Sequence, residues 1–223
     1  MFICYNDIIN VWKVKRVKKY KILLLILLIL FSAPLYSDSD KYVLSMEDSI
    51  KLDDKTIVFR IKALRNIGKF VKAGDLGGYI ESEKNLSSTG NAWVSSQATV
   101  SGNAKVVDDA WVGGDAKVSG NAIIEDKAKV TGNAEVSGNT TIQDKAKVQG
   151  NAKVSGNAII EGKAKVQGNT EVSGNARLYQ NAVVTSDAKV SGNAKLGENA
   201  IVCGDAEISG NKTIENLVVG ATC

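Results

Sequence analysis

Apolar residues recur with a period of six along most of this chain. From Asn91 to Asn216 the sequence divides into 21 consecutive six-residue units without an insertion. Position four of every unit is Val, Ile or Leu, and position two is Ala except at Thr140, Thr170 and Lys212. Residues two apart on a strand point to the same side, so each unit predicts one short strand with its small and branched residues inside. Gly followed by Asn, Asp or Lys predicts the corners, because Gly and Asn tolerate the left-handed conformation of a sharp bend.

A second period, of 18 residues, predicts how these strands stack. The tripeptide Ser-Gly-Asn recurs with its serine at Ser101, Ser119, Ser137, Ser155, Ser173, Ser191 and Ser209. Three units therefore form one coil, and seven coils at the usual strand spacing of about 4.8 Å form a column about 34 Å tall. The predicted fold class is all-β: a single-stranded parallel β-helix, a triangular prism of three sheets around an apolar core.

The repeat, with its Val-Ser-Gly-Asn-Ala-Lys pattern, resembles the hexapeptide-repeat superfamily, whose members are left-handed parallel β-helices. The preceding segments Arg60–Leu64, Gly74–Ile80 and Asn85–Ser87 are similar to the region before the repeat in bacterial and phage members without an assigned activity. Better-known members are trimeric acyltransferases with a catalytic histidine, or zinc enzymes with three histidine ligands. This chain has no histidine, so the resemblance transfers no catalytic or metal-binding residue.

The flanking segments break the six-residue rule. We expect residues 38–90 to form a small β-rich cap over the first coil, because Ile57–Leu64 alternates like a strand after a turn at Asp53-Asp54. The stretch Gly74–Gly78 is interpreted as a turn, since it lacks the Gly-Lys-Ser/Thr ending of a phosphate-binding loop. The repeat covers residues 91–216, and residues 217–223 form a weak C-terminal cap that leaves a parallel edge open to another chain.

Residues 1–37 have the layout of a signal peptide or a signal anchor. A basic cluster precedes the apolar run Ile22–Phe31, and a short polar segment leads to a predicted cleavage site after Ser37. The bulk of the chain is therefore expected to be exported, as a periplasmic, cell-surface or secreted protein. If the segment stays uncleaved, residues 13–36 anchor it in the inner membrane and are its only membrane contact.

Charge and composition exclude several function classes. Residues 1–37 hold six of the 28 Lys and Arg residues and one of the 24 Asp and Glu residues, so the rest carries 22 basic and 23 acidic residues. That balance, with only 6% aromatic residues, argues against nucleic-acid binding. Without histidine, the usual acid/base group at neutral pH is also missing. We expect no catalytic residue, no metal site and no cofactor.

Two cysteines, Cys203 and Cys223, follow the signal segment. They are too few for a disulfide framework. We interpret them as incidental, with a bond between them or between chains as the alternative.

One outer face of the predicted column gathers lysines. Three of them share a column with Trp93 and Trp111, and three lie at the adjoining corner; together they form a candidate anion-binding strip of Lys127, Lys129, Lys145, Lys147, Lys163 and Lys165. Acidic residues just before them, such as Asp126 and Asp144, offer the alternative of a self-compensated surface. The two tryptophans are candidate sugar-stacking aromatics, although packing under the cap is the favoured interpretation.

The other two faces have structural interpretations. On one, Lys and Glu alternate up the stack, beside serine and asparagine columns that can form side-chain hydrogen-bond ladders. On the other, outward Ile123 and Ile159 suggest side-to-side association, as in trimeric relatives.

These features favour a non-catalytic exported β-solenoid that serves as a structural spacer or interaction scaffold at the cell envelope. An acidic polysaccharide or another envelope component is the expected partner, and a homo-oligomer, either trimeric or end-to-end, is the expected assembly. The alternatives are an acyltransferase-like trimer and a self-assembling β-helix filament.

Overall fold

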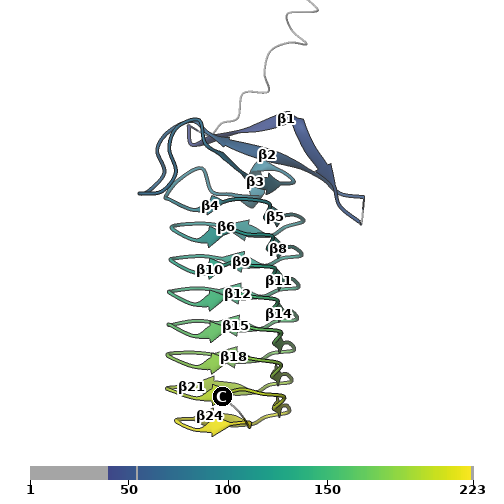
Figure 1. The fold of residues 1–223 in the computed structure, drawn as a ribbon, viewed down its shortest axis with the longest axis vertical. Coiled ribbons are helices and arrows are strands. Elements are labelled where there is room, and N and C mark those ends of the chain that lie inside the picture. The colour runs from purple at the N-terminus through teal and green to yellow at the C-terminus, as the bar shows by residue number, and fades with distance from the viewer. Residues whose placement is uncertain (1–39, 54, 222–223) are drawn as a thin grey trace, which may run out of the picture. The chain divides into compact units, whose positions relative to one another are not determined.

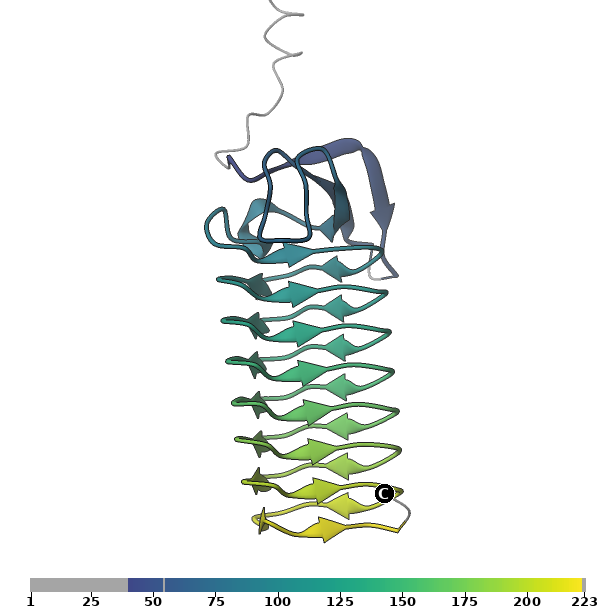
Figure 2. The ribbon, with the colours of Figure 1, turned by 60° about the vertical axis from the view of Figure 1, so that its left-hand side comes forward.

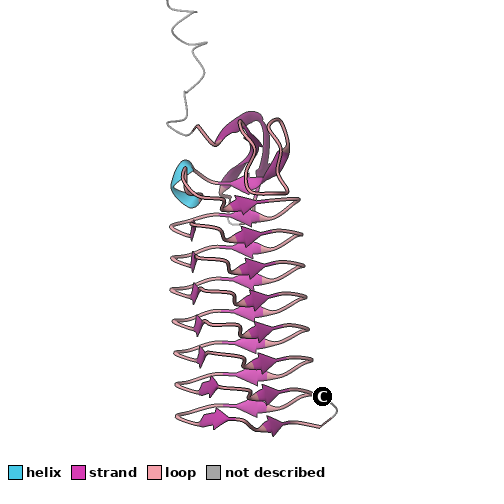
Figure 3. Ribbon diagram, turned by 90° about the vertical axis from the view of Figure 1, so that its left-hand side faces the viewer, coloured by secondary structure: helices cyan, strands magenta, loops and turns pink. Residues whose placement is uncertain are grey.

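The computed structural model describes residues 40–53 and 55–221, and the predicted signal segment 1–37 lies outside them. Within the compact unit Ser37–Cys223, short strands stack coil on coil into a parallel β-solenoid (Figure 1). The predicted all-β fold with an 18-residue spacing is confirmed. The described part of the chain contains one helical turn, η1 (Glu83–Asn85), close to the cap strands (Figure 3). No helix in the described ranges has the length and apolar character needed to cross a membrane.

Three sheets run along the column (Figure 2). The first sheet contains, in spatial order, β1 (Tyr42–Lys51), β2 (Ile57–Ala63), β3 (Leu76–Ile80), β5 (Thr99–Val100), β8 (Lys117–Val118), β11 (Glu135–Val136), β14 (Lys153–Val154), β17 (Glu171–Val172), β20 (Lys189–Val190) and β23 (Glu207–Ile208). The second contains β4 (Trp93–Val94), β7 (Trp111–Val112), β10 (Lys129–Val130), β13 (Lys147–Val148), β16 (Lys165–Val166), β19 (Val183–Val184), β22 (Ile201–Val202) and β25 (Val218–Val219). The third contains β6 (Lys105–Val106), β9 (Ile123–Ile124), β12 (Thr141–Ile142), β15 (Ile159–Ile160), β18 (Arg177–Leu178), β21 (Lys195–Gly197) and β24 (Thr213–Glu215).

Successive coils stack in register, so equivalent residues lie directly above one another. Val94 pairs with Val112, and Val112 pairs with Val130, in parallel strands. All three side chains are fully buried, as are the alanines at position two from Ala92 to Ala200. The alternation of small and branched residues therefore builds one continuous apolar core along the column.

The second sheet has eight stacked strands, one more than the seven coils predicted from the repeat. The extra strand is β25, which pairs in parallel with β22. Its residues were expected to form a weak cap, but they continue the solenoid. The last corner is one residue shorter, because Ile201 pairs with Val218 at a separation of 17 residues. That deletion ends the six-residue frame and hides the eighth coil from pattern analysis.

The cap is an antiparallel extension of the first sheet. Strands β1 and β2 pair antiparallel, β2 pairs antiparallel with β3, and β3 then pairs in parallel with β5 of the solenoid. The strand expected at Ile57–Leu64 is confirmed as β2. The turn expected at Gly74–Gly78 is only partly right, because Leu76–Ile80 is strand β3. Gly77 and Gly78 are required there, since an added Cβ would lie within 3 Å of neighbouring atoms that include backbone oxygens of the first coil.

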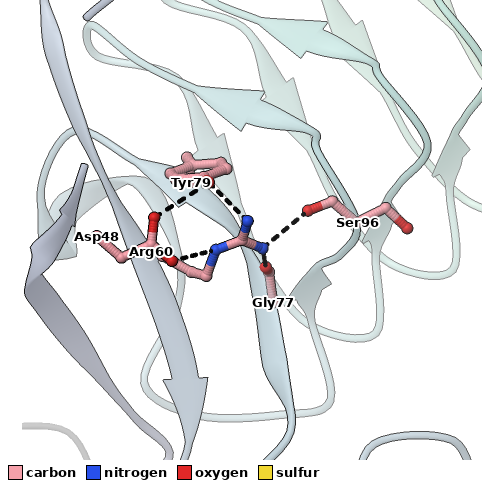
Figure 4. A network of polar contacts seen from close by, with 5 residues as sticks. All are labelled: Asp48, Arg60, Gly77, Tyr79 and Ser96. Atoms are coloured by element: carbon pink, nitrogen blue, oxygen red, sulfur yellow. Dashed lines mark hydrogen bonds and ion pairs between the residues drawn. The ribbon is translucent and has the colours of Figure 1, made fainter. Parts of the chain in front are cut away.

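A polar network joins the cap strands to the first coil (Figure 4). Arg60 forms an ion pair with Asp48 at 2.8 Å, and its guanidinium lies 4.3 Å from the centre of the Tyr79 ring. The same guanidinium donates to the Tyr79 hydroxyl at 2.6 Å and to the carbonyl oxygens of Gly77 and Ser96 at 2.8 and 3.4 Å. One side chain thus ties β1, β2 and β3 to the coil beneath them.

A buried lysine lies just before strand β1 of the cap. Lys41 is fully buried, and its ammonium donates to the carbonyl oxygens of Ser87 and Thr89 at 2.9 and 3.2 Å. Burial, aided by the positive charge of Arg65, lowers the pKa of Lys41 to about 8. The segment 87–89 is therefore held by a charge-assisted contact to Lys41, the residue just before β1.

The corners carry the predicted asparagine ladder. Six hydrogen bonds of 2.8 to 3.0 Å link the side-chain amides of Asn103, Asn121, Asn139, Asn157, Asn175, Asn193 and Asn211. The serine column beside it forms no such ladder within the described residues. The serine side chain is too short to span one strand spacing, whereas the longer asparagine side chain reaches the asparagine in the next coil.

Cys203 corrects the interpretation of the cysteines as incidental. It is fully buried and forms a disulfide, and it is the only cysteine among the described residues. Its partner therefore lies outside them, as does Cys223.

Candidate functional site

The predicted lysine strip consists of two rows with different surroundings. In the face row, Lys129 pairs with Lys147, and Lys147 pairs with Lys165, in adjacent strands of the second sheet. Trp111 stands before this row and Val183 after it. All three lysines are exposed, and within the described residues none of them forms an ion pair. The face row therefore presents one unpaired ammonium group in each of three successive coils.

The corner row is interleaved with acidic residues. Lys127, Lys145 and Lys163 line a shallow hollow of about 430 Å³ together with Asp108, Asp109, Asp126, Asp144 and Gly162. The aspartates also support the backbone: Asp108 accepts from the amide of Asp126, Asp126 from that of Asp144, and Asp144 from that of Gly162, at 3.3, 3.1 and 2.9 Å. Four carboxylates thus line the same hollow as three ammonium groups, so the self-compensated interpretation fits this row.

The pKa of Glu125 indicates the sign of the charge around this corner. Its pKa is raised, first by burial and then by the negative charges of Asp126, Asp108 and Asp144. An acid whose neighbours raise its pKa lies in a locally negative environment. The residues that stay candidates for anion binding are therefore fewer than predicted: the face row of Lys129, Lys147 and Lys165.

The two tryptophans were predicted to share one outward column, and the structure separates them. Trp93 pairs with Trp111 in register, but Trp93 is only 1% exposed and belongs to the core cluster that includes cap residues such as Ile61. Trp93 is therefore unavailable for stacking on a ligand, and the favoured interpretation of packing under the cap holds for it. Trp111, one coil further along, is half-buried and keeps part of its ring surface exposed.

A groove between the cap and the first coils contains the exposed part of Trp111. Its volume is about 880 Å³, and it is lined by Ile67, Gly68, Lys69, Phe70, Asn91, Asp109, Trp111, Lys127, Lys129 and Thr131. Phe70 is 82% exposed, the most exposed large apolar side chain in the described part of the chain. The groove is therefore lined by two aromatic side chains, Phe70 and Trp111, and by the first lysine of each row.

Phe70 and its loop were missed by the sequence analysis. The loop carries no repeat, and a single phenylalanine in an irregular segment looks like an ordinary core residue. A usable signal was the short spacing of Ile67, Phe70 and Val71, since three large apolar residues close together in a tight turn cannot all point inward.

The two remaining faces are stabilised locally. In the alternating Lys and Glu column, Lys189 and Glu207 form an ion pair of 3.7 Å, and both are exposed. On the third sheet, Arg177 forms an ion pair with Glu161 at 2.5 Å, and the Tyr179 hydroxyl donates to Glu215 at 2.5 Å. These contacts are consistent with the structural interpretation of both faces.

The described residues contain no metal-binding cluster, and comparison with known proteins identifies no further site. Within residues 40–53 and 55–221, no three Cys, Asp or Glu side chains are grouped so as to hold a metal ion. No model of a known protein family matches the sequence, and no curated protein matches it either.

Proposed function

We propose that this protein is an exported, non-catalytic member of the hexapeptide-repeat β-helices that binds an acidic glycan at the cell envelope. The observation that carries the proposal is the face row: three exposed ammonium groups that form no ion pair within the described residues and are stacked in register on one sheet. Like charges held this close oppose folding by tenths of a kcal/mol per pair. A bound polyanion offsets that repulsion.

The geometry favours a linear polyanion over a single small anion. Successive coils are about 4.8 Å apart, a distance close to the length of one sugar ring in an extended chain. A glycan with an acidic group on successive residues therefore matches one carboxylate to one lysine per coil. The solenoid then acts as a rigid scaffold that holds the polymer along its side.

The test is binding of the full-length protein to polygalacturonate, measured by titration calorimetry at increasing salt. We expect affinity to fall with ionic strength, because exposed charges are screened over about 10 Å at 0.1 M salt. Lys147→Glu, which reverses the central charge of the row, is expected to weaken binding about tenfold, equivalent to about 1.4 kcal/mol.

Lys195→Glu is the matched control. Lys195 is exposed on the third sheet and pairs with Arg177 and Thr213. A glutamate at this position therefore has no acidic register neighbour, and the substitution reverses one exposed charge outside the face row. Equal binding by the wild type and Lys147→Glu, or equal losses in both variants, contradicts a role for the face row.

The acyltransferase-like alternative has its own assay. The full-length protein is incubated with acyl-coenzyme A and candidate sugars, and release of free coenzyme A is followed. We expect no turnover, because the chain has no histidine to serve as the general base. Sustained release of coenzyme A rejects the non-catalytic proposal.

A self-assembling filament remains the second candidate, and one observation favours it. Strands β23, β24 and β25 are each the last strand of their sheet, so the end of the column opposite the cap has unpaired edges within the described residues. Parallel edges of this kind can accept strands from another chain.

A further inference from the structure

The turn that carries Phe70 is anchored on both sides of this residue. Ile67 and Val71 pair with each other through backbone hydrogen bonds of 2.9 and 3.3 Å, and both side chains are buried. The Gly68 amide donates to Asn91 Oδ1 at 3.1 Å, which ties the turn to the first coil. Phe70, between these anchors, is held 82% exposed. An apolar ring displayed by a rigid turn next to a half-buried indole favours a flat ligand with an apolar face.

The polar lining defines the rest of that ligand. Lys69, Lys127 and Lys129 face a single carboxylate, that of Asp109. Asp109 accepts a hydrogen bond from Asn91 Nδ2 at 2.8 Å, and its second oxygen can accept one from a ligand hydroxyl. Because Lys127 also shares the corner hollow with four aspartates, Lys69 and Lys129 supply the positive charge that favours an anionic ligand. A small inorganic anion would leave both rings unused and would lie near Asp109, whereas an acidic sugar has a ring face, hydroxyls and a carboxylate.

The groove is also continuous with the face row. Lys129 lines the groove and pairs in register with Trp111 on one side and Lys147 on the other. A glycan whose terminal sugar occupies the groove is therefore directed along Lys147 and Lys165.

We propose that the cap groove is a subsite that stacks one acidic sugar residue against Phe70 and Trp111 and so holds the end of the bound glycan. This inference rests on the proposed function and deepens it, since it adds an end-binding position to the linear row. The lysines hold the carboxylate, and Asn91, Asp109 and Thr131 contact the hydroxyls.

The experiment titrates full-length protein with digalacturonic acid and follows the indole N–H signals by NMR. The Trp111 signal, assigned with Trp111→Phe, is expected to shift, while that of buried Trp93 stays in place. Phe70→Ala is expected to weaken the disaccharide at least fivefold. Leu64→Ala, which removes another large side chain of the cap that is 52% exposed and does not line the groove, is expected to leave binding unchanged.

Four outcomes decide between the two proposals. A disaccharide that fails to shift the Trp111 signal, or that binds Phe70→Ala as tightly as the wild type, overturns the groove. If polygalacturonate still binds in that case and Lys147→Glu weakens it, the row stands without the groove. If binding of the disaccharide depends on Phe70 while binding of polygalacturonate is unaffected by Lys147→Glu, the groove proposal stands and the face-row proposal does not. Equal binding of neutral cellobiose, or competition by inorganic phosphate, overturns the assignment to an acidic sugar.

Discussion

Two buried hydroxyl groups interrupt the apolar interior of the column. Thr140 and Thr170 occupy position two, where the neighbouring coils have alanine, and both are fully buried. Their Oγ1 atoms have no hydrogen-bond partner within the described residues. A buried hydroxyl without a partner costs on the order of 1 to 3 kcal/mol. At the residue scale, these threonines are therefore core positions where a substitution can raise stability.

Thr140→Val should stabilise the protein. Valine keeps the shape of threonine and removes the unpaired hydroxyl, so we expect the free energy of unfolding to rise by about 1 kcal/mol. Thermal denaturation followed by circular dichroism measures the effect. Thr141→Val, the same substitution at the adjacent outward position, is the control and should change stability by less than about 0.5 kcal/mol. A lower midpoint for Thr140→Val would mean that the hydroxyl is satisfied inside the column.

The direction of each repeat residue was predictable, because alternation along a strand leaves only two sides. Trp93 shows where that rule fails. It occupies an outward position, yet the cap covers it and leaves it 1% exposed. The repeat predicts which way a side chain points, but burial also depends on what packs outside it. The face row was therefore found from the sequence, and Phe70, in the irregular loop, was not.

At the scale of the strand and its corner, the coils are locked by close backbone contacts. Gly138 has φ 74°, and an added Cβ would lie 2.6 Å from the carbonyl oxygen of Gly156 in the next coil. Gly210 has nearly the same φ, 73°, but no atom lies within 4 Å of that point. A comparison of the two positions therefore separates the free-energy cost of the left-handed backbone conformation from the cost of a clash with the next coil.

Gly138→Ala should therefore destabilise more than Gly210→Ala. The left-handed conformation costs an alanine about 1 kcal/mol at either position, and the clash with the next coil adds about 1 to 3 kcal/mol at Gly138 alone. Urea denaturation of the two variants measures the difference. Equal losses would show that the coils separate easily enough to admit a methyl group.

The strands and their register followed from the 18-residue period, since only one stacking aligns every branched residue. Strands β1 and β3 had no such signal, because the cap is held by antiparallel pairing between distant segments and by Arg60. The eighth coil was missed because a single absent residue shifts Leu217 and Val218 out of the six-residue frame. Pattern analysis thus succeeds where the structure repeats, whereas at the ends it identified β2 but missed β1, β3 and the eighth coil.

On the scale of the whole molecule, the two ends of the column are unlike. The cap closes the first, and the other ends in β23, β24 and β25, where Leu217 and Val218 are more than half exposed. Lys212 occupies the position that alanine fills in most coils, and it is exposed. A charge placed at an open edge is a common protection against pairing with other chains.

Lys212→Ala is expected to promote end-to-end association. Removing the ammonium group exposes the apolar end of the core, so the variant should form larger species as its concentration rises. Light scattering after size-exclusion chromatography compares it with the wild type. Lys189→Ala, which removes an exposed lysine from a side face, is the control. Identical sizes for the wild type and Lys212→Ala would leave the open end without a part in assembly, and filaments in the wild type would favour the second candidate function.

In-register stacking also limits how such a molecule can change in length. Removing six residues would rotate everything below the cut by one face and scatter the lysine row over two sheets, whereas removing 18 would shorten the column and keep each face intact. Growth by duplication follows the same arithmetic, and every added turn can lengthen the cationic row by one lysine. The cationic row can therefore change length only in whole turns, and the number of turns that carry a lysine on that face would set the span of any polymer bound there.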